Sequence, residues 1–167
     1  GMPYNIADPE REMDRLVVRP AQVFRDKNRI DLLTGHEVTA IDPAARKVTG
    51  MSSAGEPFEK TYDKLLIATG AVPRLPDING IDLPGVVVLK NLADGRRIKR
   101  LIAEKPVKKA VIIGMGYIAL EMCEAFRKRN IATTMIKPGA VFMPWMPRSL
   151  SEIVSEELAQ QWVELHP

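Results

Sequence analysis

The sequence predicts an α/β protein in which a small antiparallel β-meander precedes a parallel β-α-β unit. Three observations predict this fold. Short runs of β-type residues, separated by Asp/Pro and Ser/Gly turn signals, lie between residues 30 and 62. A glycine-containing turn at residues 114–116 follows one apolar run and precedes an amphipathic stretch. A second apolar run then occupies residues 132–136.

The first half of the chain predicts β-structure after a weakly patterned start. Residues 9–24 predict a short helix or an irregular segment that ends near Arg19-Pro20. Strands are predicted at Ile30–Leu33, Glu37–Ile41, Arg46–Met51 and Phe58–Tyr62. We expect the last three to form the meander, because residues 42–45 and 52–55 have hairpin-turn chemistry. Residues 64–68 form a nearly continuous apolar run, which predicts a strand buried on both faces.

A Pro/Gly-rich segment, residues 70–85, is the best linker candidate in the chain. It divides the chain into predicted domains 1–84 and 85–167. The basic cluster at residues 96–100 lies on a predicted helix, and its charges are expected to form a solvated face. The apolar side of this helix is predicted to consist of Leu92, Ile98, Leu101 and Ile102.

The remaining elements follow the alternation of strand and helix. Strands are predicted at Lys109–Ile113 and Ala132–Ile136, with a helix at Tyr117–Arg129 between them. A further helix is predicted at Ser149–Trp162, with Ser149 as its cap and Glu152 three residues on. A third strand is expected to begin at residue 163.

Composition excludes several classes of protein. The 167 residues are 46% hydrophobic, which is ordinary for a globular chain of one domain or two small ones and excludes disordered and collagen-like classes. One cysteine, Cys123, and two distant histidines, His36 and His166, supply neither a disulfide nor four zinc ligands, so no metal site is predicted.

Charge and hydropathy give little support for nucleic-acid or membrane partners. The net charge of +3 is too small a surplus to indicate nucleic-acid binding. No apolar stretch approaches the roughly 18 residues of a spanning helix, and no secretory signal is visible. We therefore expect a cytoplasmic protein with neither kind of partner.

The turn Gly114-x-Gly116-x-x-Ala119 has the spacing of a dinucleotide-binding fingerprint in a Rossmann-type βαβ unit. Gly114 permits the tight turn, Gly116 lets a pyrophosphate approach the backbone, and Ala119 lets the helix lie close to the strands. The helix start offers free N–H groups to phosphates. The alternative is a glycine-rich αβ turn without a ligand.

The acidic residue that usually binds the ribose 2′-OH, roughly 20 positions after the first glycine, is missing. Lys137 stands at the end of the second predicted strand, and no Asp or Glu lies between Glu124 and Glu152. A 2′-phosphate would be attracted to such an edge, which favours NADPH over NADH. The alternatives are that this lysine is merely solvated or that the site binds nothing. Cys123 falls on the sheet-facing side of the helix and is expected to be a small buried hydrophobe.

Two motifs together resemble a known family. These are Tyr62-Asp63-Lys64-Leu65-Leu66-Ile67-Ala68-Thr69-Gly70-Ala71-x-Pro73 and Val111-Ile112-Ile113-Gly114-x-Gly116-Tyr117-Ile118-Ala119-Leu120-Glu121. The chain is similar to the FAD-dependent pyridine nucleotide-disulfide oxidoreductases, and most similar to their single-cysteine branch of NADH oxidases, NADH peroxidases and coenzyme A-disulfide reductases. Residues 36–42 also resemble that family's meander strand.

The resemblance implies roles for particular positions. Ala68, Thr69 and Gly70 would lie by the FAD, and the backbone of Val38 would face its adenine. Gly114, Gly116 and Ala119 would hold the pyrophosphate of the nicotinamide nucleotide. Tyr117 would gate the flavin face, and Glu121 would lie near the nicotinamide.

The chain also departs from the family pattern. It lacks the flavin-binding GxGxxG, the later Gly-Asp segment, and the redox cysteine that would precede Gly1-Met2-Pro3-Tyr4. The family's C-terminal dimerisation domain is missing too. The resemblance therefore implies a partial FAD-binding domain followed by a truncated NAD(P)H-binding domain, with no catalytic residue in this chain.

Two functions remain open at this point. The first is a piece of a flavoenzyme that moves hydride from NAD(P)H to FAD and on to a disulfide, oxygen or peroxide. On this hypothesis the isolated chain is inactive, because the FAD site is incomplete. The second is a truncated, non-catalytic nucleotide-binding or interaction module. The expected partners are the missing remainder of the flavoenzyme or a second copy of the chain in a homo-oligomer.

Overall fold

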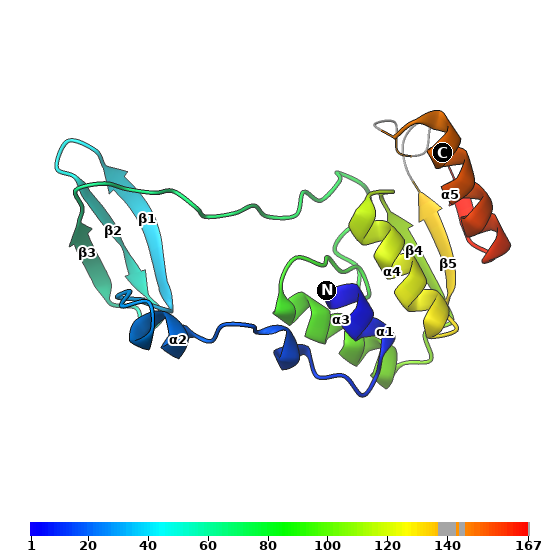
Figure 1. The fold of residues 1–167 in the computed structure, drawn as a ribbon, viewed down its shortest axis with the longest axis horizontal. Helices are drawn as coiled ribbons and strands as arrows, with labels where there is room; N and C mark the ends of the chain where they lie inside the picture. The colour runs from blue at the N-terminus through cyan, green and yellow to red at the C-terminus, as the bar shows by residue number, and fades with distance from the viewer. Residues whose placement is uncertain (137–142, 144–145, 167) are drawn as a thin grey trace. The chain divides into compact units, whose positions relative to one another are not determined.

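The computed structural model describes residues 1–136, 143 and 146–166, and its ribbon is drawn in Figure 1. These residues form two compact units. The nucleotide unit combines Gly1–Leu16 with Val72–Pro167, and the meander unit is Val17–Ala71. Each unit is described by itself below.

The meander unit contains the predicted antiparallel sheet. Helix α2 (Ala21–Asp26) precedes strands β1 (His36–Asp42), β2 (Lys47–Ser52) and β3 (Pro57–Thr61), which pair in the order β1-β2-β3. The Asp42 carboxylate accepts a 2.9 Å hydrogen bond from the Ala45 N–H, which closes the first hairpin turn. Three of the predicted strands are thus confirmed within a residue or two.

Two other predicted strands are absent from the meander unit. Ile30–Leu33 and residues 64–68 are irregular, and the side chains of Leu66 and Ile67 are 87% and 64% exposed. In the part of the chain that the structure describes, neither run has a ladder partner. A strand buried on both faces needs neighbouring strands and two covering layers, and apolar sequence alone supplies neither.

The segment before Pro20, predicted as a short helix or an irregular segment, is largely irregular. It contains a short 3-10 turn, η1 (Met13–Leu16), and α2 begins directly after Pro20, which is its N-cap. Proline fits a helix start because its fixed φ is already helical and its missing N–H has no partner there.

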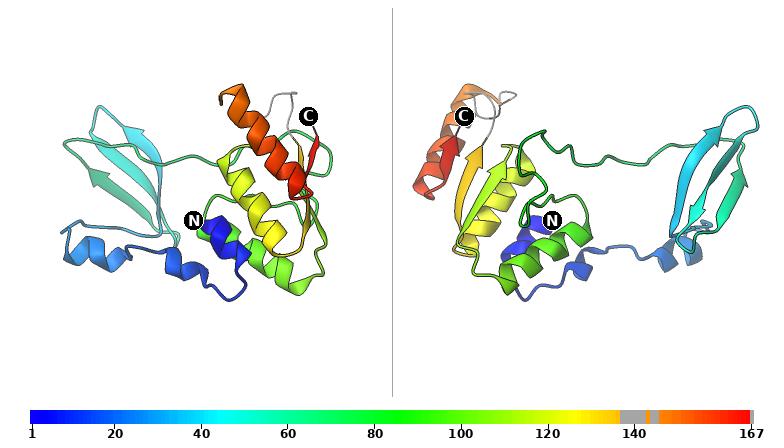
Figure 2. Two further views of the ribbon diagram at one scale, coloured as in Figure 1. Left: turned by 45° about the vertical axis from the view of Figure 1, so that its right-hand side comes forward. Right: turned by 180° about the vertical axis from the view of Figure 1, so that it is seen from behind.

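The nucleotide unit contains the predicted parallel β-α-β unit. Strands β4 (Lys109–Ile113), β5 (Ala132–Ile136) and β6 (Glu164–His166) pair in parallel in that order. Helix α4 (Tyr117–Lys128) connects the first two, and α5 (Arg148–Gln160) lies between β5 and β6 in the chain (Figure 2). The fold class is therefore the predicted one.

One apolar cluster joins the sheet to both of these helices. Ile112 and Leu165 on the strands pack against the buried Cys123 of α4, Met135 of β5 and Leu158 of α5. The other face of β4 is open, since Val111 and Ile113 are 60% and 56% exposed. The alternation of exposed and half-buried residues along β4 follows from the two-residue period of a strand.

Helix α5 begins one residue earlier than predicted. Pro147 is its N-cap, and Ser149 lies inside the first turn, so the predicted Ser149 cap is wrong. The Glu152 carboxylate instead forms a 2.9 Å ion pair with Arg148, four residues before it. This i,i+4 pair competes with the hydrogen bond that a glutamate can make to the backbone of an N-cap residue.

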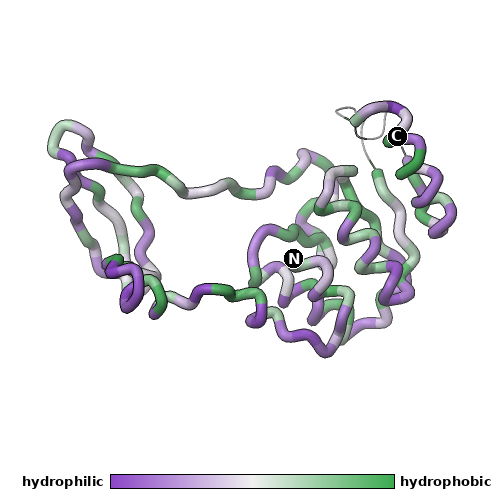
Figure 3. Tube along the Cα trace, viewed as in Figure 1, coloured by the Kyte–Doolittle hydropathy of each residue, from purple (hydrophilic) through white to green (hydrophobic). Residues whose placement is uncertain are grey.

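The basic helix α3 (Leu92–Glu104) has a capping box at its start and its predicted apolar side inward. The Asn91 side chain accepts from the Asp94 N–H at 3.0 Å, and the Asp94 carboxylate accepts from the Asn91 N–H at 3.0 Å. Ile98 is buried. Figure 3 shows apolar and polar residues alternating around α3 and α4.

The basic face of α3 is only partly solvated, which corrects the prediction. Arg97 and Arg100 are exposed as expected. However, Arg96 pairs with Asp14, and Lys99 donates to the N-terminal segment. These contacts join residues more than 80 positions apart, so no local pattern indicates them.

Helix α1 (Met2–Ala7) is an element that the sequence does not predict. It packs on α3 and α4, with Ile6 fully buried. Because of this packing, residues 1–16 belong to the same compact unit as residues 72–167. The compact units therefore do not follow the predicted boundary at residue 84. The division into two domains at that residue stays a prediction.

In the described part of the chain, none of the helices combines the length and the apolar character that crossing a bilayer requires.

Candidate nucleotide-binding site

The candidate site is the turn between β4 and α4. The backbone of Gly114 has φ +121°, a conformation that side-chain-bearing residues rarely adopt. Its N–H donates a 2.7 Å hydrogen bond to the carbonyl of Ile136, the last residue of β5. The turn is therefore fixed to the ends of two parallel strands, where ligands bind in open α/β sheets.

Gly116 is the N-cap of α4, with φ −91° and ψ −177°. A Cβ added at Gly114 or Gly116 would meet no atom within 4 Å, so the space beside the helix start is open. No side chain caps the first turn of the helix. Open space and the positive end of the helix dipole together form a cradle that fits a pyrophosphate.

Ala119 lies one turn further along α4, on the side that faces the sheet. It is half-buried and packs against the cluster that contains Cys123 and Met135. A small side chain here keeps the helix close to the strands, which is the role that the sequence predicts.

Tyr117 and Glu121 are four residues apart, so they lie on the same side of α4. Tyr117 is 64% exposed beside the open turn, and Glu121 is half-buried. Their predicted roles toward a flavin and a nicotinamide stay predictions.

Lys137, the basis of the predicted preference for NADPH, lies outside the described residues. The residue before it, Ile136, is 37% exposed and ends β5 directly beside Gly114. The end of this strand is therefore adjacent to the turn, as the fingerprint requires.

The residues predicted to contact FAD lie in the meander unit. Val38 is on β1, paired with Gly50, and is 50% exposed. Residues 68–70 are exposed and irregular, and Gly70 has φ +73° with open space around it. Exposed backbone of this kind can contact a ligand, and the assignment of these residues stays a prediction.

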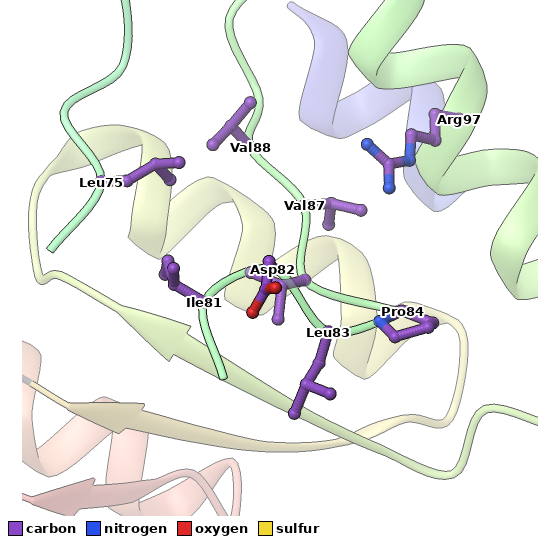
Figure 4. A pocket seen from close by; sticks show the side chains of 9 residues that line it. Leu75, Ile81, Asp82, Leu83, Pro84, Val87, Val88 and Arg97 are labelled. Atoms are coloured by element: carbon purple, nitrogen blue, oxygen red, sulfur yellow. The ribbon is translucent and has the colours of Figure 1, made fainter. Parts of the chain in front are cut away.

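A shallow apolar groove elsewhere in the nucleotide unit contains none of the predicted site residues. It has a volume of about 520 Å³ and is formed by Arg97 of α3 and by Leu75, Ile81, Asp82, Leu83, Pro84, Val86, Val87 and Val88. Figure 4 shows Leu75, Ile81 and Leu83 around it, with Asp82 as its acidic group. Among the described residues, no three His, Cys, Asp or Glu side chains gather to form a metal site.

Cys123 is 2% exposed in the apolar cluster, as predicted. Burial raises the pKa of its thiol, and the nearby Arg127 only partly opposes this shift. A thiol of this kind is a poor nucleophile, because the thiolate is the reactive form.

The raised pKa predicts that part of the folding stability is lost at high pH. The folded state keeps the Cys123 proton after the unfolded chain has released it, so stability is full below the unfolded pKa and falls as pH rises through the folded pKa. We expect the free energy of unfolding to slope downward with pH above the ordinary pKa of a thiol, roughly 8.5. Urea unfolding from pH 7 to 10 should show this slope for the native chain and a reduced slope for Cys123→Ala; equal slopes would contradict the prediction.

Sequence reasoning missed Asn5 and Lys99, which fix the N-terminal segment on the nucleotide unit. Pro3 in the first turn of α1 is the single local signal, since proline favours a helix start. Lys99, one of the two partners of the Asn5 side chain, is 94 residues away, so spacing gives no indication of this contact.

Comparison with known proteins gives consistent matches along nearly the whole chain. A family model described as pyridine nucleotide-disulphide oxidoreductase matches residues 3–167. An NADH oxidase of Methanocaldococcus jannaschii is 30% identical over 166 residues, which are 99% of this chain and 37% of the relative. A CoA-dependent NAD(P)H sulfur oxidoreductase of Pyrococcus furiosus is 35% identical over 161 residues, 96% of this chain and 36% of the relative.

Solved structures match in fold as well. The crystal structure of reduced Bacillus anthracis CoADR-RHD has a TM-score of 0.93 at 30% identity, covering 99% of this chain and 30% of that one. An engineered water-forming NADPH oxidase bound to NADPH has a TM-score of 0.89 at 26% identity, covering 99% of this chain and 36% of that one. The chain thus spans about a third of the length of the proteins it matches.

Proposed function

Since this chain belongs to the pyridine nucleotide-disulphide oxidoreductase family, we propose that its β4–α4 turn binds the pyrophosphate of NAD(P)H as part of a flavin-dependent oxidoreductase. The full reaction would move hydride from NAD(P)H to FAD and on to a disulfide, oxygen or peroxide. The observation that carries the proposal is the open cradle at Gly114 and Gly116, beside the uncapped start of α4.

Each site residue has a defined task in this proposal. Gly114 and Gly116 admit the pyrophosphate, and Ala119 holds the helix against the sheet. Tyr117 and Glu121 lie one helical turn apart on the side where the nicotinamide end would extend. Lys137 would attract a 2′-phosphate, which is the reason for proposing NADPH as the preferred nucleotide.

The proposed flavin contacts are Ala68, Thr69, Gly70 and the backbone of Val38. The chemistry that a bound flavin supplies is acceptance of a hydride and delivery of two electrons to the final acceptor. No catalytic residue is assigned in this chain, because its one thiol, Cys123, is buried with a raised pKa. We therefore expect the 167-residue chain to bind nucleotide without turning it over.

A non-catalytic nucleotide-binding or interaction module is the second candidate function. It is favoured by the compactness of the nucleotide unit, which forms its own apolar clusters. A second copy in a homo-oligomer would then cover the exposed apolar face of β4, at Val111 and Ile113, whereas in the first candidate function the remainder of the flavoenzyme would cover it. A cytoplasmic location stays a prediction.

The proposed function predicts that NADPH raises the thermal midpoint of the chain, and does so at lower concentration than NADH. A ligand that binds only the folded form adds about 2.7 kcal/mol at 100 times its Kd. Separate titrations, followed by thermal unfolding, check both the binding and the preference. Absence of a shift with either nucleotide would contradict the site, and tighter binding of NADH would contradict the role of Lys137.

The absorbance spectrum of the same sample separates the two candidate functions. Stoichiometric bound flavin would show that the FAD contacts in this chain suffice and would contradict an incomplete site. Nucleotide binding without flavin would favour the module.

A further inference from the structure

Lys99 makes three of the hydrogen bonds that hold the N-terminal strap, defined as residues Gly1–Leu16, on the rest of the nucleotide unit. The ammonium of Lys99, on α3, donates to the Asn5 side-chain oxygen at 3.3 Å, to the Asp8 carbonyl at 2.8 Å and to the Arg11 carbonyl. A lysine has three donors, and all three are used here. One side chain therefore fixes both the helix and the loop of the strap.

Asn5 extends this polar contact into the interior. Its side chain is fully buried and donates a 2.9 Å hydrogen bond to the Glu12 carbonyl while accepting from Lys99. A buried amide left without partners is costly, so Asn5 and Lys99 depend on each other. The strap can detach only by losing the whole set of bonds.

The apolar side of the strap reaches the helix that carries the nucleotide turn. Ile6 and Met13 form a cluster with Ile98 of α3 and Met122 of α4, all at most 6% exposed. At the other end of α4, Lys128 lies 5.9 Å from the centre of the Tyr4 ring. The strap thus contacts the middle and the C-terminal part of α4, and the blue helix α1 lies beside α4 in Figure 1.

Helix α4 is consequently packed between two apolar clusters. One contains Cys123 and faces α5 and β5, and the other contains Met122 and faces the strap and α3. Ile112 of β4, two residues before Gly114, contacts both clusters. Ile112 therefore links the cluster that contains the strap to the strand that leads into the turn.

We propose that the strap is a positioning element of the nucleotide site, an inference that rests on the function proposed above. Docking of the strap through Lys99 and binding of the nucleotide pyrophosphate at Gly116 stabilise each other. Lys99 and Asn5 are positioning residues, since they lie on the strap side of α4 and touch none of the turn residues in the contacts described. By thermodynamic linkage, if docking of the strap raises the affinity for the nucleotide by some factor, binding of the nucleotide raises the equilibrium constant for strap docking by the same factor.

The first experiment uses the unmodified chain. Amide hydrogen exchange is measured with and without saturating NADPH, and the strap amides are expected to exchange about five-fold more slowly with nucleotide bound. Protection of the turn at residues 114–118 without any change in residues 5–16 would overturn the coupling. Failure of NADPH to bind at all would instead overturn the proposed function, and the coupling with it.

The second experiment compares Lys99→Met with Arg100→Met. Arg100 is the next residue on α3, is exposed and carries the same charge, so it controls for loss of a positive charge. Lys99→Met is expected to raise the Kd for NADPH about five-fold and to speed exchange of the strap amides, while Arg100→Met changes neither. The Kd is measured well below the thermal midpoint, so that unfolding does not contribute.

Two results of this comparison would overturn the proposal. One is a freed strap with an unchanged Kd, which would make the strap a structural element alone. The other is an equal loss of affinity in both variants, which would assign the effect to charge. If Lys99→Met does not fold, Asn5→Ala is compared in the same way, and the exchange experiment on the unmodified chain decides the coupling by itself.

Discussion

Replacement of Gly116 with valine is expected to reduce NADPH affinity at least about 100-fold, which corresponds to about 2.7 kcal/mol. The folded chain has room for the new side chain, because a Cβ at this position meets no protein atom within 4 Å and the backbone is extended, with φ −91°. The same space is where the pyrophosphate would approach the backbone. Loss of affinity would therefore come from exclusion of the ligand.

Stability measurements test this explanation directly. Gly116→Val should lower the free energy of unfolding by only about 1 kcal/mol, since glycine is a better N-cap than valine. Gly85→Ala is the control for a glycine change remote from the turn: Gly85 also has open space around it, and its φ of +99° makes the change strained. It should cost stability and leave the Kd unchanged. Undiminished NADPH binding by Gly116→Val would contradict the site.

Replacement of Gly50 with alanine is expected to destabilise the meander unit by about 3 kcal/mol, at the upper end of overpacking effects. Gly50 lies in the middle of β2, opposite Val38 on β1 and Phe58 on β3. A Cβ here would overlap the carbonyl oxygen of Glu37 and lie 2.7 Å from the Phe58 ring. Backbone on one side cannot move away without loss of the β1–β2 ladder.

Hydrogen exchange resolved along the chain checks this second prediction. Residues 36–61 should lose protection in Gly50→Ala, while β4 and β5 keep theirs, because they belong to the other compact unit. Gly55→Ala is the matched control in the neighbouring turn, where φ is +82° and a Cβ meets nothing within 4 Å. Its cost should be about 1 kcal/mol. Equal losses for the two variants would contradict the steric explanation.

Sequence patterns predicted the elements whose partners are close in the chain. The β1–β2–β3 meander and the β4–α4–β5 unit follow from turn chemistry and apolar periodicity, which act over a few residues. The candidate turn was predicted for the same reason. Glycine is favoured at position 114 because the backbone φ is positive, and at position 116 because a side chain would fill the open space beside the helix start.

The patterns failed where burial depends on distant segments. The run at residues 64–68 has the composition of an interior strand, yet Leu66 and Ile67 are exposed, because no other described residue supplies a ladder partner or a covering layer. The reverse holds for the basic helix, where Lys99 was expected in solvent and instead holds the strap. In the first case the described contacts include no strand that pairs with the run. In the second case the partner of Lys99 is remote in the sequence.

The discontinuous nucleotide unit also has a consequence for the order of folding during synthesis. The meander is contiguous, so its strands can pair as soon as residue 61 has left the ribosome. Ile6, by contrast, finds its hydrogen-bond partner Arg129 only 123 residues later. Helix α1 can therefore complete its packing only after α4 has been synthesised. Contacts of such long sequence separation form slowly, so we expect docking of the strap to be a late step of folding.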